Sequence, residues 1–171
     1  TRLEKLLTGR PVLLTATSGI ASIVLGGATV SSMNMLALLG YNQTDESIRA
    51  NNPKGKFPLD TIIVIDEVGL LSTEQFRQLD VALRAIGRET EFLGGFQVVI
   101  GGDFGQMPTI HWGESLEGSM YLEAFKLVEL VENIRQKNDP EFFKNLMEIR
   151  ENGMSDQNLD FIKKHASPEE V

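Results

Sequence analysis

Short continuous apolar runs alternate along this chain with apolar stripes at helical spacing. The runs predict strands that are buried on both faces, and they lie at residues 12–15, 61–65, 96–100 and 125–131. The clearest stripe follows a capping box made by Ser72 and Gln75, and it consists of Phe76, Leu79, Leu83 and Ile86. A second helix is expected to start at Asp139-Pro140 and to end at Gly153. This alternation predicts an α/β fold with a parallel sheet between helices.

The remaining segments carry weaker signals. Residues 1–7 predict the end of a short helix, and two further helices are expected at 19–25 and 29–39, separated by Gly26-Gly27. Residues 42–58 are polar and contain two prolines and an Asn-Asn pair, so they predict a surface loop.

Composition narrows the class of protein. A length of 171 residues suits one domain. With no cysteine and two histidines, a disulfide framework and a structural zinc site are both excluded. No apolar run approaches the ~20 residues of a membrane span, so we expect no membrane partner and an intracellular location. The net charge of -8 argues against a simple nucleic-acid-binding module.

The charge is unevenly distributed. Residues 1–60 carry six Lys and Arg against four Asp and Glu, a net +2, whereas residues 61–171 carry ten against twenty, a net -10. Any contact with nucleic acid is therefore expected mainly in the first third of the chain.

Polar side chains follow the predicted strands at the end where ligands bind in open α/β sheets. Asp66 and Glu67 come directly after the strand at 61–65. Asp66 is suited to hold Mg²⁺ through water, and Glu67 to polarise a water that attacks a phosphate. Two adjacent acids are also common in solvated turns, so this motif alone leaves both interpretations open.

Two further strand ends carry candidate groups. Residues 101–108 combine turn-forming glycines and a proline with Asp103 and Gln106, polar groups able to sense a phosphate. Arg135 follows the predicted strand at 125–131, where a guanidinium can clamp phosphate oxygens. A lone arginine is more often part of a surface ion pair.

Small hydroxyl residues and glycines gather at the start of the helices predicted near the N-terminus. Such groups can contact a phosphodiester, and the candidates are Thr15, Thr17, Ser18, Gly19, Thr29 and Ser31. Ordinary helix capping by Thr17 or Ser18 explains the pattern locally as well.

Taken together and in this order, the segments resemble the Pif-family, RecD-like branch of superfamily 1 DNA helicases. Residues 15–21 and 29–32 resemble the two motifs that contact single-stranded DNA, and residues 63–67 the Walker B motif. Residues 94–97 with 102–108 resemble the third motif, the most specific of the set. Residues 135–153 are similar to the segment that closes the first motor domain. The resemblance covers residues 11–165.

This resemblance implies a RecA-like P-loop NTPase core that uses ATP and Mg²⁺ and moves 5′ to 3′ on DNA. Asp66 would hold Mg²⁺ and Glu67 would activate water. Gln106 would sense the γ-phosphate beside Asp103, and Arg135 would stabilise charge on it. The six hydroxyl and glycine candidates would contact single-stranded DNA or a DNA junction.

The chain also departs from the family pattern. No Gly-x-x-x-x-Gly-Lys-[Ser/Thr] loop occurs in it, so we expect its N-terminus to lie within or just past that loop. Ser31 stands where the family usually has histidine, and Met33 near a usual aromatic. The second RecA-like domain would follow residue 165. Without the strand of the loop we expect an interrupted sheet, whose exposed edges invite pairing with another copy, and no ATP hydrolysis or unwinding by these residues alone.

Two other classes of protein stay open. A non-catalytic helicase-like module that binds DNA or partners fits the missing loop, whereas the intact Asp66, Glu67 and Gln106 speak against it. A different P-loop ATPase, such as a clamp-loader-like subunit, would not need the segment at residues 15–21.

Overall fold

The computed structural model describes residues 9–18, 22–23, 26, 28–29, 43–106 and 113–165. The chain forms two compact units, Thr1–Phe125 and Lys126–Val171. The predicted helix end at residues 1–7 and nearly all of the helices predicted at 19–25 and 29–39 lie outside the described residues, but Thr29 itself belongs to a strand rather than to a helix.

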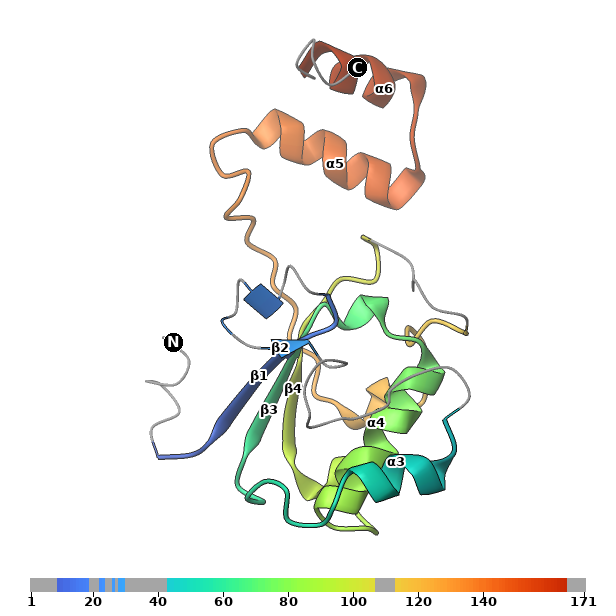
Figure 1. Cartoon of the computed structure of the whole chain (residues 1–171). Coiled ribbons are helices and arrows are strands. Elements are labelled where there is room, and N and C mark those ends of the chain that lie inside the picture. Colours follow the sequence, from blue (N-terminus) through green and yellow to red (C-terminus); the bar gives the residue numbers. More distant parts are fainter. Residues whose placement is uncertain are drawn as a thin grey trace. The chain divides into compact units, whose positions relative to one another are not determined.

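The first unit is built on a parallel sheet, which confirms the predicted fold class. Its strands are β1 (Val12–Ala16), β2 (Ala28–Thr29), β3 (Ile62–Asp66) and β4 (Gln97–Ile100), in the order β2-β1-β3-β4 (Figure 1). Every pairing is parallel. β3 is an inner strand, because it pairs with β1 on one side and with β4 on the other. Its β-branched residues suit such a buried position.

The sheet corrects one expectation about strand order. β1, β3 and β4 are direct neighbours, with Leu14 beside Val64 and Val64 beside Val99. The predicted interruption between these strands is therefore wrong. Instead, β4 pairs with β3 on one side and with no described strand on the other.

The structure also corrects the predicted burial of β4. Val98 and Ile100 pack against the core, whereas Gln97 is exposed and Val99 is 47% exposed. The strand thus alternates, as expected where one face of a sheet packs on a core and the other lacks cover among the described residues.

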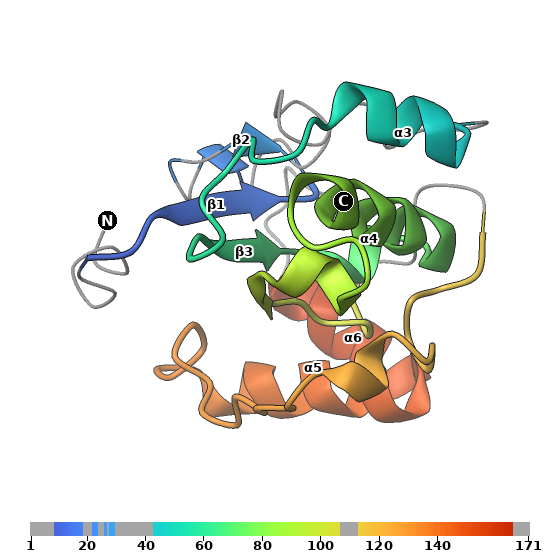
Figure 2. The same ribbon diagram turned by 90° about the horizontal axis from the view of Figure 1, so that it is seen from below.

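Two helices flank the sheet side by side, as both views show (Figures 1 and 2). α4 (Thr73–Ile86) has the predicted capping box, in which Ser72 Oγ accepts from Gln75 N and Gln75 Oε1 accepts from Ser72 N. Its predicted apolar stripe is fully buried and belongs to one core cluster with Ile63 and Ile65 of β3. These observations confirm the predicted helix.

The other helix, α3 (Asp45–Asn51), occupies part of the segment that predicted a loop. Thr44 caps it by accepting a hydrogen bond from Ser47 N at 3.2 Å, and Asp45 and Glu46 favour its first turn. Ile48 anchors it because that side chain is completely buried. One buried apolar residue and a good cap therefore outweigh the polar composition of residues 42–58.

A tight turn, the 3-10 element Phe92–Gly95, leads from α4 into β4. Leu93 and Gly94 both have positive φ, at 48° and 66°. The buried carboxylate of Asp80 holds this turn, accepting from Leu93 N at 2.7 Å and from Arg84 Nε at 2.8 Å. The turn thus depends on a charged residue inside α4.

The second unit begins with an irregular segment where a strand was predicted. Residues 126–133 form no strand, and Leu127 and Leu130 are 87% and 91% exposed. The prediction of a strand at 125–131 is therefore wrong. An apolar run becomes a strand only where a neighbour pairs with its backbone, and no described strand does so here.

Two helices complete this unit. α5 (Pro140–Asn152) confirms the predicted start, because Asp139 Oδ1 accepts from Phe142 N at 2.9 Å, and Gly153 follows its last residue. α6 (Asp156–His165) was not predicted, and it packs beside α5 with Phe161 stacked on Phe142. Asn158 is buried between them, hydrogen-bonded to Ser155 and to Asn145 and Glu148 of α5.

Candidate functional site

The carboxyl ends of three strands lie at one edge of the sheet. Ala16 of β1 pairs with Asp66 of β3, and Ile65 of β3 pairs with Ile100 of β4. The residues that follow each strand, beginning with Thr17, Glu67 and Gly101, are therefore adjacent. The ends of β3 and β4 thus confirm two of the three strand ends that were expected to converge, whereas the third, after the strand predicted at 125–131, does not exist as a strand end.

Asp66 is the last residue of β3, and its carboxylate is partly buried. Its Oδ1 accepts from the Glu67 backbone N–H at 2.9 Å. A Cβ added at Gly101 would lie 3.3 Å from the same oxygen, so glycine leaves open the space beside this carboxylate. A single hard oxygen donor with open space fits a Mg²⁺ ion that keeps most of its waters.

Glu67 has a left-handed backbone, with φ 57° and ψ 38°. For a residue other than glycine this conformation costs roughly 1–2 kcal/mol, and such residues gather at functional sites. Hydrogen bonds hold the peptides on both sides of its Cα. The preceding peptide accepts from Thr17 N at the Asp66 carbonyl, at 3.1 Å. In the following peptide, the Glu67 carbonyl accepts from Thr17 Oγ1 at 2.6 Å, and Val68 N donates to the Gly101 carbonyl at 2.9 Å. These hydrogen bonds fix the backbone of Glu67 and with it the position of its Cα–Cβ bond.

The loop after β4 packs closely on the turn after β3. A Cβ at Gly102 would lie 2.9 Å from Val68 N and 3.1 Å from Gly69 N, so only glycine allows this approach. Further along, the Asp103 carboxylate accepts from Gly105 N at 2.9 Å and from Gln106 Nε2 at 3.1 Å. The structure therefore gives Asp103 the role of ordering its own loop and holding the Gln106 amide.

The predicted DNA-contacting residues fall into different environments. Thr15 has no exposed surface, and its hydroxyl donates to the Val64 carbonyl at 2.9 Å, so it cannot reach DNA in this structure. Thr17 and Ser18 are partly buried at the sheet edge. Thr29, the last residue of β2, pairs through its backbone with Ala16 of β1, so Thr29 also lies at that edge of the sheet. Gly19 and Ser31 lie outside the described residues.

Arg135 belongs to the second unit, in an exposed turn. Asn133 orders this turn by accepting from Gln136 N at 2.9 Å and donating to Gln136 Oε1 at 2.7 Å. Its predicted role at a phosphate stays a prediction, because Arg135 belongs to the second unit and Asp66, Glu67 and Gln106 belong to the first.

The described residues contain no group of three or more His, Asp or Glu able to hold a metal by themselves. They also contain no helix long and apolar enough to cross a membrane. A metal ion at the sheet edge would thus be held by Asp66 together with water or a bound phosphate, and not by a cluster of described carboxylates.

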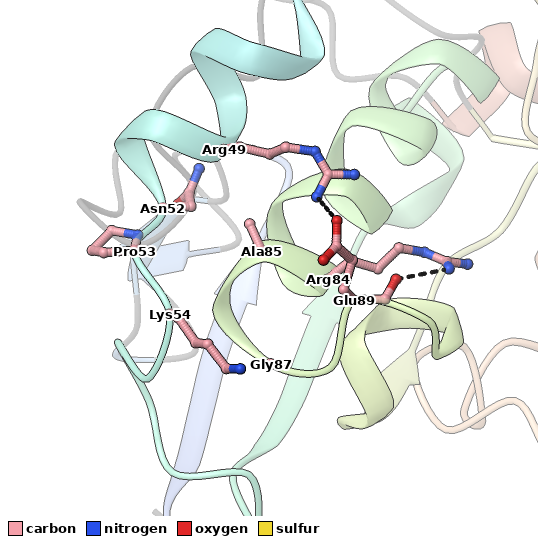
Figure 3. Close-up of a pocket in the computed structure, with 8 residues that line it drawn as sticks. All are labelled: Arg49, Asn52, Pro53, Lys54, Arg84, Ala85, Gly87 and Glu89. Carbon is pink, nitrogen blue, oxygen red and sulfur yellow. Dashed lines mark hydrogen bonds and ion pairs between the residues drawn. The ribbon is translucent and has the colours of Figure 1, made fainter.

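A hollow of about 250 Å³ lies elsewhere, where α3 and α4 end (Figure 3). Arg49 and Arg84 line it, and both donate to Glu89, to its carboxylate at 3.2 Å and to its carbonyl at 3.3 Å. None of the predicted site residues lines this hollow. The guanidinium groups of Arg49 and Arg84 are therefore already bonded to protein acceptors.

Sequence reasoning missed one support of the site, Thr17, and one support of the turn that enters β4 at its other end, Asp80. Thr17 was singled out as a DNA contact rather than as a partner of Glu67, and Asp80 was not singled out at all. The signal for Asp80 was available, since an acidic residue at a core position of an amphipathic helix requires a buried partner.

Comparison with known proteins gives a consistent result. The family model described as PIF1-like helicase matches residues 2–158. The ATP-dependent DNA helicase PIF1 of Emericella nidulans is 25% identical over 167 residues, which are 92% of this chain and 22% of that protein. The ATP-dependent DNA helicase PIF3 of Trypanosoma brucei brucei is 32% identical over 146 residues, covering 83% of this chain and 17% of that protein.

Solved structures show the same fold. The Pif1 helicase from Candida albicans superposes with a TM-score of 0.79 at 24% identity, covering 98% of this chain and 40% of that one. The Pif1 helicase from Bacteroides in complex with ADP-AlF3 and ssDNA gives a TM-score of 0.72 at 24% identity, covering 98% of this chain and 43% of that one.

Proposed function

This chain belongs to the PIF1-like helicase family, and we propose that it supplies the nucleotide-hydrolysing and DNA-contacting edge of an ATP-dependent DNA helicase that moves 5′ to 3′. The chain spans about a fifth of the length of the first curated relatives, 22% and 19%. The activity is therefore proposed for the intact protein that carries it.

One observation supports this proposal most directly. Asp66, the strained Glu67 and the Asp103–Gln106 loop follow neighbouring parallel strands and are tied together by the hydrogen bonds from Val68 to Gly101 and from Gln106 to Asp103. An acid, a second acid and an amide at one sheet edge are among the groups that phosphoryl transfer to water uses.

The proposed chemistry divides among these residues. Asp66 would hold Mg²⁺ through water, and the ion would offset charge on the transferred phosphate. Glu67 would accept the proton of the attacking water. Gln106 would contact the γ-phosphate from a loop that Asp103 keeps in place. Arg135 is proposed to stabilise negative charge on the same phosphate.

Single-stranded DNA or a DNA junction is the proposed partner. Ser18 and Thr29 lie at the same sheet edge, and we include Gly19 and Ser31 in the proposed contact from the sequence pattern. The Bacteroides Pif1 structures determined with ssDNA are consistent with such a partner. Contacts of this kind are to the sugar-phosphate backbone, so binding should weaken with salt and depend little on sequence.

The test is an ATPase and unwinding assay on the intact protein with and without single-stranded DNA, beside Glu67→Gln. This variant keeps the size of the side chain and removes the base, so we expect ATP turnover to fall by about 10²-fold or more. Duplexes with a 5′ or a 3′ single-stranded tail report the direction, and only the 5′-tailed duplex should be unwound. Turnover equal to that of Glu67→Gln, with DNA binding retained, would instead establish a non-catalytic DNA-binding module.

We further propose self-association through β4, the outer edge of which pairs with no strand among the described residues. The Pif1 structure described as two coordinating helicases at forked dsDNA is compatible with more than one copy acting together. Sedimentation velocity of wild type and of Val99→Lys tests this idea, because a charge on the edge strand should shift a dimer toward monomer. Identical monomeric profiles would refute it.

A further inference from the structure

Thr17 binds the backbone on both sides of the Glu67 Cα. Its N–H donates to the Asp66 carbonyl at 3.1 Å, and its hydroxyl donates to the Glu67 carbonyl at 2.6 Å. The two residues are 50 positions apart in the chain. A loop that the sequence marks as DNA-contacting is therefore bonded directly to the residue proposed to activate water.

The left-handed backbone of Glu67 needs such support. Without restraint, this conformation is unfavourable by roughly 1–2 kcal/mol, comparable to one net hydrogen bond of about 0.5–1.5 kcal/mol. The Thr17 hydroxyl holds the carbonyl after the Glu67 Cα, and the Gly101 carbonyl holds the next N–H. Removing the first of these bonds leaves the peptide that follows Glu67 held through its N–H but no longer through its carbonyl.

The hydroxyl of Thr17 has one proton, and that proton is already donated. A phosphodiester oxygen accepts hydrogen bonds and donates none, so Thr17 cannot bond a DNA phosphate through the same proton while it holds Glu67. The two roles are thus mutually exclusive at any moment. The short distance to the Glu67 carbonyl favours the internal bond.

Thr15 supplies an internal comparison. It lies on β1, two residues before Thr17, and makes the same kind of bond, from its hydroxyl to the Val64 carbonyl at 2.9 Å. Val64 lies within β3, whereas Glu67 lies beyond its end. The hydroxyls of Thr15 and Thr17 therefore differ in which carbonyl they hold, and only Thr17 reaches the proposed catalytic turn.

We infer that Thr17 is a positioning residue for Glu67 rather than a DNA contact, and this inference rests on the proposed function. Its hydroxyl fixes the left-handed backbone and so aims the carboxylate at the attacking water. Small displacements of such a group lower turnover steeply. Thr17 would therefore influence kcat and leave the affinity for DNA unchanged.

The experiment compares Thr17→Val, Thr17→Ser and Thr15→Val in the intact protein. We expect Thr17→Val to lower kcat of the DNA-stimulated ATPase by about 3- to 10-fold, the size of one hydrogen bond, with the Kd for single-stranded DNA unchanged. Thr17→Ser keeps the hydroxyl and should restore most of kcat. Thr15→Val should leave both quantities close to wild type.

A second readout does not depend on turnover. Amide hydrogen exchange at Val68, which donates to the Gly101 carbonyl, should accelerate in Thr17→Val and not in Thr15→Val. A wild-type protein without DNA-stimulated ATPase would contradict the proposed function but leave this exchange test valid. Unchanged exchange at Val68, or a weaker Kd for DNA with kcat intact at saturating DNA, would overturn the positioning role of Thr17.

Discussion

Replacing Gly94 by alanine tests how the turn before β4 is packed on α4. Gly94 is buried with φ 66°, and an added Cβ would lie 2.6 Å from the Leu83 carbonyl carbon and 3.1 Å from Arg84 N. Both atoms belong to the backbone of a helix and cannot move aside independently. The substitution therefore adds a steric clash to the strain of a positive φ.

Gly118 provides the matched control. Its φ is 71°, close to that of Gly94, but it is exposed and an added Cβ would meet nothing within 4 Å. Gly118→Ala should cost about 1 kcal/mol of unfolding free energy, since only the backbone conformation is disfavoured. Gly94→Ala should cost about 2–4 kcal/mol, because overpacking typically adds 1–3 kcal/mol.

Urea denaturation followed by far-ultraviolet circular dichroism measures both variants against wild type. The informative quantity is the difference between the two losses, in which the shared backbone strain cancels. Equal losses would mean that the turn at 92–95 does not rest on α4 in solution, and the reasoning about this close approach would be wrong.

Three shorter predictions concern the site and its flank. Gly102→Ala should displace the loop that carries Gln106 and reduce ATP turnover more than it reduces stability; unfolding and ATPase measurements on the same samples separate the two effects. Glu67→Gly should be more stable to urea than Glu67→Ala by about 1 kcal/mol, and the opposite order would show that residue 67 is not left-handed. Arg77→Met should cost less than about 1 kcal/mol of unfolding free energy at pH 7, because its ion pairs are exposed. The hydrogen bond from Arg77 lowers the pKa of Glu74 from its ordinary value of 4.5, so the ion pair stabilises the fold above pH 4.5 and loses this effect as the pH falls further. Denaturation of wild type and Arg77→Met across pH 3–7 would reveal this loss.

The sequence predicted best where the signal is local. The β-branched run of β3 and the capping box of α4 are complete within a few residues, and both elements appear where expected. The helix α3 was missed because its decisive residue, Ile48, is a single apolar position whose burial depends on distant partners. The run at 125–131 failed for the opposite reason, since its apolar residues predict a strand but no described strand pairs with it.

The candidate site shows the same division. Asp66 and Glu67 were identifiable because they directly follow a recognisable strand, and the register of β1, β3 and β4 brings their surroundings together. The left-handed conformation of Glu67 and its bond to Thr17 were not predictable. Glutamate has no preference for that conformation, and the bond joins residues whose proximity only the sheet order reveals.

The C-terminal helix pair is held by polar contacts more than by apolar ones. Asn158 is the one buried residue within residues 126–165, whereas Leu146 and Leu159 each keep more than a third of their surface exposed. Little apolar surface is covered, so melting of α5 and α6 should contribute little to the heat-capacity change. In calorimetry this pair should melt as a broad, low-enthalpy shoulder ahead of the sheet, and a protease should cut it first on gentle warming.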